Sequence, residues 1–246
     1  MVVLKSKKSE EPFYDKVEKI QGWLNPAAGR RTQDILEWQA AQGIKGNLFE
    51  IGVFCGKYFA LLLESAIKHD GKVLGVDTFQ FTSTERVDQE MDKLFGADAK
   101  DRYTLMKRAS STLTSEPVRK AIGRPRFISI DGAHDYENVF RDLEFCEDLV
   151  APNGIISVDD FLNPLTLGVN QAVNAFYQKP RKVVPVAYVS NKLFLAHASH
   201  EDRYRKAFEQ AIMKGDDPQS KHFRAMIEKG RDHVAQPFYG HEVLLS

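Results

Sequence analysis

The stretch FISIDGAHDYENVFRDLEF, from Phe127 to Phe145, joins a strand pattern to a helix pattern. An apolar run ends at Asp131, a glycine follows, and His134 precedes a segment in which apolar residues recur at helical spacing. A strand that passes through a short turn into a helix is half of a strand–helix–strand unit. The stretch therefore predicts that Asp131 and His134 lie at the mouth of a sheet flanked by helices.

The same alternation extends to both sides of this stretch, from about Asn47 to Ala196. Seven segments have strand character: NLFEIG, KVLGVDTF, YTLMKRA, RFISID, GIISVDD, KVVPVAYV and KLFLAH. Helical segments lie between them, at about 57–68, 83–95, 111–122, 137–149 and 165–177. Only Ser190 and Asn191 separate the last two strands, which is too short for a crossover. We therefore expect an α/β fold with a seven-stranded, mostly parallel sheet, helices on both faces and an antiparallel C-terminal hairpin.

The segments outside this alternation predict helical additions. PFYDKVEKIQGWL and TQDILEWQAAQ have helical spacing, as has EDRYRKAFEQAIMKG, whereas the tail from Asp216 to Ser246 is polar with a weak helix near 223–229. We expect an N-terminal helical addition at 1–46, a central domain at 47–197, and a C-terminal helix and tail at 198–246. N-terminal additions often cap a site or make a dimer contact, so a homo-oligomer is one possible state of the protein.

Composition excludes several classes of protein. Of 246 residues, 43% are hydrophobic and the formal net charge is zero, so no whole-protein field favours nucleic acid or an anionic membrane. No run approaches the roughly 18 apolar residues of a membrane span, and the start, MVVLKSKKSEEPFYD, lacks the apolar centre of a signal peptide. The two cysteines, Cys55 and Cys146, are too few for a disulfide framework. We expect a cytoplasmic protein without a nucleic-acid or membrane partner.

Polar residues at the predicted strand ends point to an adenosine-containing ligand. Ligands of open parallel sheets bind at the carboxyl ends of the strands, near the point where the strand order reverses. The first strand ends at Glu50, and Gly52 and Gly56 follow in the turn before the helix. Asp77 ends the second strand, at about the interval at which an acidic residue binds ribose in dinucleotide folds. The glycine pair alone is weak evidence, because turns between strand and helix commonly contain glycine.

The details of this turn favour S-adenosylmethionine over a dinucleotide. Phe54 stands where the dinucleotide fingerprint needs its second glycine to admit a pyrophosphate. Glu50 suits a ligand that carries positive charge, and S-adenosylmethionine has an ammonium and a sulfonium. The short-chain dehydrogenase pair Tyr-x-x-x-Lys is also missing after Tyr136, because Phe140 takes the place of the lysine.

Three carboxylates predict a divalent metal beside the adenosine pocket. The fourth strand ends at Asp131 and the fifth at Asp159 and Asp160. Close carboxylates repel one another unless a cation is present, and hard oxygen ligands suit Mg²⁺, Ca²⁺ or Mn²⁺. Turn chemistry at Asp131 and helix capping at the other two are the structural alternatives. His134 alone would be an ordinary surface histidine, but beside a metal it is a candidate general base.

These segments resemble class I S-adenosylmethionine-dependent methyltransferases. The similarity covers about Asn47 to Phe176 and rests on FEIGVFCG, GVDTF, IDGAHDYENVFRDLE and LVAPNGIISVDDF. Within that class the chain is similar to the metal-dependent O-methyltransferases of the macrocin O-methyltransferase type, and more distantly to catechol O-methyltransferase. The resemblance implies a Rossmann-like sheet and methyl transfer to a hydroxyl of a small molecule such as a sugar or a phenol.

The resemblance also implies roles for particular residues. The cofactor-binding set would be Glu50, Gly52, Gly56, Asp77, Ser110 and Asp131, the metal ligands Asp131, Asp159 and Asp160, and the catalytic base His134. Ser110 takes the adenine-side position, although LMKRAS lacks the glycine often found before this Ala-Ser pair. The segment VDDF, in place of Asn/Asp-Pro-Pro-Tyr, argues against methylation of an amino group. A nucleotide-dependent oxidoreductase, a non-catalytic binding module and purely structural carboxylates are the alternatives.

Overall fold

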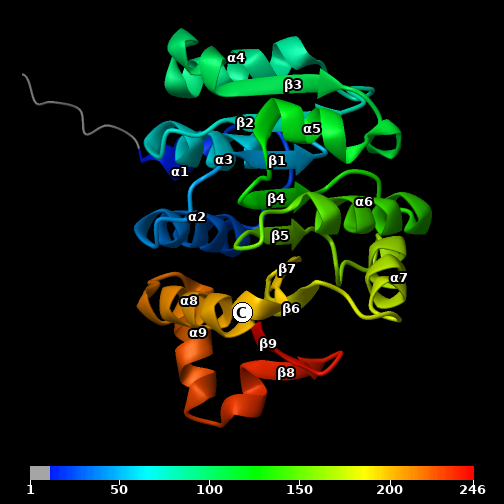
Figure 1. The fold of residues 1–246 in the computed structure, drawn as a ribbon. Coiled ribbons are helices and arrows are strands. Elements are labelled where there is room, and N and C mark those ends of the chain that lie inside the picture. The colour runs from blue at the N-terminus through cyan, green and yellow to red at the C-terminus, as the bar shows by residue number, and fades with distance from the viewer. Residues whose placement is uncertain (1–11) are drawn as a thin grey trace, which may run out of the picture.

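The structure, a computed structural model, describes residues 12–246 and within them places nine strands in one sheet (Figure 1). The order of the strands is β3-β2-β1-β4-β5-β7-β6-β9-β8. The strands are β1 (Leu48–Ile51), β2 (Val73–Asp77), β3 (Tyr103–Lys107), β4 (Phe127–Ile130), β5 (Ile155–Val158), β6 (Val183–Val189), β7 (Lys192–His197), β8 (Ala235–Phe238) and β9 (His241–Leu245). Strands β1 to β5 pair in parallel, and β7 is antiparallel to both β5 and β6. The predicted α/β class, the mostly parallel sheet and the antiparallel hairpin are confirmed.

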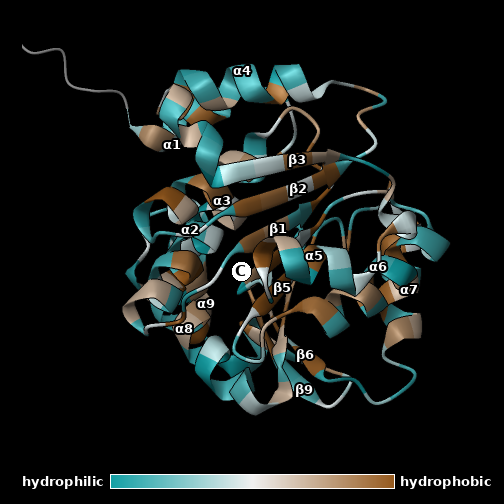
Figure 2. Ribbon diagram, turned by 45° about the horizontal axis from the view of Figure 1, so that its top comes forward, coloured by the Kyte–Doolittle hydropathy of each residue, from teal (hydrophilic) through white to brown (hydrophobic). Residues whose placement is uncertain are grey.

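Helices cover both faces of this sheet. Figure 1 shows α2, α3 and α8 on one side and α5, α6 and α7 on the other. The helices are α1 (Phe13–Glu18), α2 (Pro26–Ala41), α3 (Lys57–Lys68), α4 (Thr84–Phe95), α5 (Ser115–Ile122), α6 (Tyr136–Leu149), α7 (Leu167–Phe176), α8 (Glu201–Lys214) and α9 (Pro218–Ile227). Four short 3₁₀ turns lie between them: η1 (Ala97–Arg102), η2 (Ser110–Thr112), η3 (Ala198–His200) and η4 (Arg231–His233). Apolar residues concentrate in the strands and on the inner faces of the helices (Figure 2), so hydrophobic burial holds the three layers together.

Local sequence sets where the main helices begin. Helix α6 starts after Asp135, whose side chain accepts a hydrogen bond from the Asn138 amide and caps the helix. Asn25 caps α2 in the same way, and a proline follows it at the first helical position. The helix predicted at 57–68 matches the bounds of α3.

The strand count differs from the seven predicted, because the C-terminal tail adds β8 and β9. β9 pairs in parallel with β6, through Ala187 and Tyr188, and β8 pairs antiparallel with β9. Val243 and Leu244 are buried, so the description of this tail as polar was wrong for its last residues. The segments AQPF and HEVLL lack the alternation with helices that marked the predicted strands. They form strands because β6 offers an unpaired edge whose backbone groups need partners. The weak helix expected near 223–229 is α9, which starts earlier, after the capping residue Asp217.

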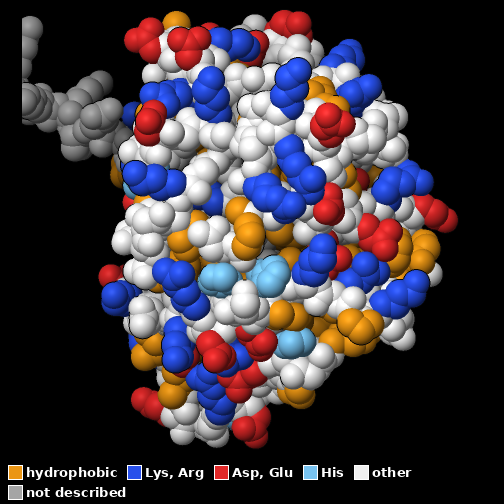
Figure 3. All heavy atoms as spheres, viewed as in Figure 1, with side chains coloured by type: hydrophobic (Ala, Val, Ile, Leu, Met, Phe, Trp, Pro, Cys, Tyr) orange, Lys and Arg blue, Asp and Glu red, His pale blue; other side chains and the backbone are white. Residues whose placement is uncertain are grey.

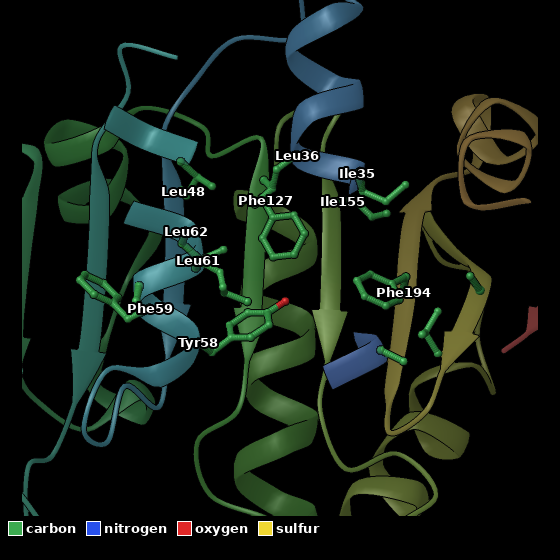
Figure 4. Close-up of a cluster of buried hydrophobic side chains, with 14 of the residues drawn as sticks. Ile35, Leu36, Leu48, Tyr58, Phe59, Leu61, Leu62, Phe127, Ile155 and Phe194 are labelled. Atoms are coloured by element: carbon green, nitrogen blue, oxygen red, sulfur yellow. The ribbon is translucent and has the colours of Figure 1, made fainter. Parts of the chain in front are cut away.

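The N-terminal helices belong to the main core. Figure 4 shows Ile35 and Leu36 of α2 packed near Phe127 and Ile155 of the sheet, with Tyr58 of α3 beside them. All five residues are buried. Because Phe127 and Ile155 are the first residues of β4 and β5, α2 packs here at the opposite end of these strands from their carboxyl ends.

Two sequence-based expectations concern membranes and export. No helix within residues 12–246 has the length and apolar character needed to cross a bilayer. Most of the segment that argues against a signal peptide, residues 1–11 of 1–15, lies outside the described residues. Cys55 and Cys146 are both free and buried.

Candidate functional site

A cavity of about 1610 Å³ opens at the carboxyl ends of the parallel strands. β1 lies between β2 and β4, so the strand order reverses here, which is where α/β sheets bind ligands. Eight of the nine predicted site residues line the cavity: Glu50, Gly52, Asp77, Ser110, Asp131, His134, Asp159 and Asp160. Gly56 is not among the lining residues. The N-terminal addition also forms part of the wall, through the segment 21–25.

The two glycines of the first turn have different roles. Gly52 has φ +86°, and a β-carbon there would lie 1.8 Å from the carbonyl oxygen of Asp131, so only glycine fits between the two loops. Gly56 has φ +89°, and a β-carbon there would lie 3.1 Å from side-chain atoms of Val87 and Met91 of α4. The second glycine therefore lets α4 approach the start of α3, and it does not face the ligand cavity.

Asp77 organises the turn that follows β1. Its carboxylate accepts hydrogen bonds from the backbone amides of Phe54, at 2.8 Å, and Phe79, at 2.7 Å. The Phe54 amide is therefore already used and is not offered to a phosphate. This contact weakens the dinucleotide alternative at the turn where that fingerprint places its pyrophosphate.

Glu50 presents a buried carboxylate to the cavity. The residue is 1% exposed and its Oε2 atom has no hydrogen-bond partner among the described residues. Burial, and then the nearby Asp131, raise the pKa of Glu50 well above its usual range. An unpaired buried acceptor costs free energy unless a ligand satisfies it. The site therefore fits a cationic group, such as the ammonium of a methionine moiety.

Ser110 lies at the cavity wall in η2. Its hydroxyl donates a 3.1 Å hydrogen bond to Asp142 of α6. Asp142 is buried, and this burial raises its pKa to about 6. The hydroxyl is therefore held toward α6 on the predicted adenine side.

A lysine ammonium lies beside two of the three predicted metal ligands. Nζ of Lys192 lies 2.8 Å from Oδ2 of Asp159 and 3.9 Å from Oδ2 of Asp131, and the residue is 2% exposed. Burial alone would lower the pKa of Lys192, but Asp159 and Asp131 outweigh it and raise that pKa. Burial and the repulsion from Asp159 raise the pKa of Asp131 to about 7. One ammonium and one proton can therefore balance the two carboxylates.

His134 lies on the solvent side of the carboxylates. Its Nε2 atom is 3.6 Å from Oδ1 of Asp131 and 3.3 Å from Oδ2 of Asp160. The Asp131 carboxylate raises the pKa of His134, and burial opposes this shift only in part. Asp160 has φ +60° and accepts hydrogen bonds from the side-chain amides of Asn163 and Asn191. The histidine is thus held beside two carboxylates while its side chain stays 41% exposed to an incoming acceptor.

The predicted ligand set does not fit a divalent metal in this arrangement. Among residues 12–246, no three His, Cys, Asp or Glu side chains are grouped so that they could hold a metal ion. Asp131 and Asp159 face Lys192, and Asp160 faces His134 and two amides. A metal bound to Asp159 at the usual Mg²⁺–oxygen distance would lie within about 5 Å of the ammonium, a repulsion of about 7 kcal/mol at an effective dielectric constant of 20.

Several residues of the site were not found by sequence reasoning. Lys192 begins the last predicted strand, and a polar first residue of a strand does not by itself indicate a functional role. Asn191 was assigned only to the hairpin turn, and Asn163 to a loop. Asp142 was part of the motif that carries the resemblance, and a buried acidic residue inside a helix was the available signal.

Comparison with known proteins supports the assignment of the fold. Residues 49–161 match a family model described as a methyltransferase domain. The O-methyltransferase NovP is similar over 69% of this chain and 80% of its own, with 16% identity and a TM-score of 0.57. The Bacillus cereus O-methyltransferase, solved in complex with SAH, is similar over 78% of this chain and 92% of its own, with 18% identity and a TM-score of 0.54. The TDP-rhamnose 3'-O-methyltransferase CalS11 is similar over 68% and 77%, with 17% identity and a TM-score of 0.52.

These matches define the class to which the fold corresponds. Residues 49–161 match the methyltransferase-domain model, and the sheet around them has the fold of the O-methyltransferases named above. No curated protein sequence matches the chain. The macrocin type suggested by the sequence motifs remains a prediction.

Proposed function

We propose that the protein is an S-adenosylmethionine-dependent O-methyltransferase that acts on a hydroxyl of a small molecule. One arrangement carries the proposal: a buried carboxylate without a partner, Glu50, opens into the same cavity as the histidine–carboxylate cluster around His134. The first suits a cationic cofactor and the second suits removal of a hydroxyl proton.

The cofactor would be held by residues of the first three strand ends. Glu50 supplies an acceptor for its ammonium, Asp77 lies at the end of β2 where ribose hydroxyls are expected, and Ser110 stands on the adenine side. When bound, S-adenosylmethionine supplies an electrophilic methyl group on sulfur. These roles for individual residues are proposals.

His134 would act as the general base. Its Nε2 atom faces the carboxylates of Asp131 and Asp160, at 3.6 and 3.3 Å, so the other ring nitrogen, Nδ1, would take the proton of the acceptor hydroxyl. The two carboxylates would stabilise the imidazolium that forms. Because Asp131 raises the pKa of the histidine, only pH values above that raised pKa leave it largely neutral and able to accept a proton. Holding the acceptor close to the methyl group would supply much of the remaining acceleration.

The mouth of the cavity suggests the character of the acceptor. Trp23, Phe81 and Leu165 line it, and each is more than 80% exposed. Trp23 also stacks on Phe54, with ring centroids 5.9 Å apart. Large apolar side chains exposed around a cavity are typical of a binding surface. We therefore propose an acceptor with an apolar or aromatic face, although sugars, phenols and other natural-product-like hydroxyls stay open.

The sequence motifs predicted a divalent metal, but for one to bind in the arrangement described Lys192 would first have to leave Asp159. The cytoplasmic location, homo-oligomer formation and the expectation that no nucleic acid binds remain predictions. Charges of both signs are mixed over the face shown in Figure 3.

Calorimetry tests the proposal directly. The full chain should bind S-adenosylmethionine and its demethylated product at one site and should not respond to NAD⁺ or NADP⁺. Hydroxylated small molecules screened with methyl-labelled cofactor would then identify the acceptor. Tight binding of a nicotinamide dinucleotide, with no heat from S-adenosylmethionine, would overturn the proposal in favour of an oxidoreductase.

A further inference from the structure

Lys192 is fixed at the candidate site by the fold. It is the first residue of β7, directly after the two-residue turn in which Ser190 has φ +55°. Its ammonium lies 4.3 Å from the ring centre of Tyr58, whose hydroxyl is 2.8 Å from that of Thr32. With 2% of its surface exposed, the side chain is enclosed by the ring and the carboxylates. The ammonium is therefore held at the carboxylates.

The hairpin turn provides partners for both aspartates that end β5. Lys192 pairs with Asp159 at 2.8 Å, and the preceding residue, Asn191, donates its side-chain amide to Asp160. Asn163 donates a second amide to Asp160, at 2.9 Å. Two consecutive residues, one in the turn and one at the start of β7, thus pair with two of the carboxylates that the sequence motif suggested as metal ligands. Charge and hydrogen bonds are supplied from within the chain.

We propose that Lys192 is the resident cation of this site and that the protein needs no divalent metal. The ammonium pairs with Asp159 and lies 3.9 Å from Asp131, which His134 also approaches, so it places a fixed positive charge at the cavity wall. A fixed cation near the base favours the negative charge that develops on an acceptor oxygen, and it needs no reorganisation during the reaction. This catalytic role rests on the proposed function, whereas exclusion of the metal depends only on the contacts of Lys192.

Metal titration of the full chain tests the inference without an acceptor. Calorimetry with Mg²⁺ and with Mn²⁺, with and without S-adenosylhomocysteine, should show no saturable binding to the parent protein. Lys192→Met keeps an apolar stem against Tyr58 but removes the charge. It should bind Mg²⁺ at least about tenfold more tightly than the parent, because a positive charge close to the ion is removed. Lys68→Ala, which removes a partly exposed lysine that does not line the cavity, should behave as the parent.

Thermal unfolding gives a second readout, which can still be measured if the variant is less stable than the parent. Lys192→Met leaves a buried carboxylate pair unbalanced, so its melting temperature should fall and Mg²⁺ should restore part of the loss. Mg²⁺ should not shift the melting temperature of the parent or of Lys68→Ala. If Lys192→Met does not fold, the titration of the parent decides alone.

Saturable binding of one Mg²⁺ per parent chain would overturn the inference, as would methyl transfer that EDTA abolishes and Mg²⁺ restores. A parent that binds neither metal nor S-adenosylmethionine would refute the proposed function while leaving the exclusion of the metal supported, so the two failures are distinguishable.

Discussion

Replacing Glu50 with glutamine should weaken cofactor binding without weakening the fold. The carboxylate is 1% exposed, one of its oxygens has no partner, and glutamine keeps its size and shape. A hydrogen bond to a charged group contributes about 1.5 to 3 kcal/mol, which corresponds to an increase of about 10- to 150-fold in the Kd for S-adenosylmethionine. The melting temperature of the ligand-free variant at pH 8 should not fall, because a neutral amide costs less to bury than an ionised carboxylate.

Proton release gives an independent measure of the same contact. The pKa of Glu50 is raised in the ligand-free protein, chiefly by burial, and a cationic ligand favours its ionised form. Binding of S-adenosylmethionine near neutral pH should therefore release protons. Calorimetry in buffers of different ionisation enthalpy would detect this release, and the glutamine variant should show a smaller dependence on the buffer.

Glu90→Gln is the matched control. Glu90 is also buried, at 8% exposure, but it pairs with Arg86 at 2.8 Å and Lys93 at 3.2 Å, and it does not line the cavity. Its replacement should lower the melting temperature slightly and leave cofactor binding unchanged. The reasoning about Glu50 fails if Glu50→Gln binds the cofactor as tightly as the parent, or if both variants weaken binding equally.

Three further changes probe the base, the ribose side and the adenine side. His134→Ala should slow methyl transfer by roughly 100- to 10,000-fold while cofactor affinity stays unchanged. The rate of the parent should fall as the pH drops through the raised pKa of His134. A variant as fast as the parent at neutral pH would rule out His134 as the base. Asp77→Ala should weaken S-adenosylmethionine binding by about 10- to 150-fold through loss of charged hydrogen bonds, and an unchanged Kd in calorimetry would contradict this. Asp142 has a pKa of about 6 in the fold, so the folded protein binds this proton more tightly than the unfolded chain does, and stability is lost as the pH rises from about 4 to about 6. Asp142→Asn removes the free-energy cost of ionising this buried carboxylate, which is on the order of 3 kcal/mol at most. Its gain in melting temperature should therefore be larger at pH 7.5 than at pH 4.5. An equal gain at both pH values would show that the pKa of Asp142 is not raised.

Much of the candidate site could be predicted because parallel strands share a direction. Once Glu50, Asp77, Asp131 and Asp159 are assigned to strand ends, the fold has to bring them to one edge of the sheet, and all four line the cavity. The role of Gly56 could not be predicted in the same way. Its left-handed backbone is a local property, but whether a ligand or a helix faces it depends on where α4 packs.

Partners that come from distant segments were decided only by the tertiary structure. Whether the cation between Asp131 and Asp159 is a metal or a side chain depends on how the β6–β7 hairpin docks beside β5, and that docking places Lys192 at the pair. β8 and β9 likewise become strands only because β6 leaves an edge to be paired. The sequence by itself determined the α/β alternation, the starts of α3, α4 and α6 to within one residue, and the edge of the sheet at which the carboxylates lie. These follow from local periodicity, capping and backbone direction. It did not determine what compensates the buried charges, because that free energy arises from contacts between residues far apart in the chain.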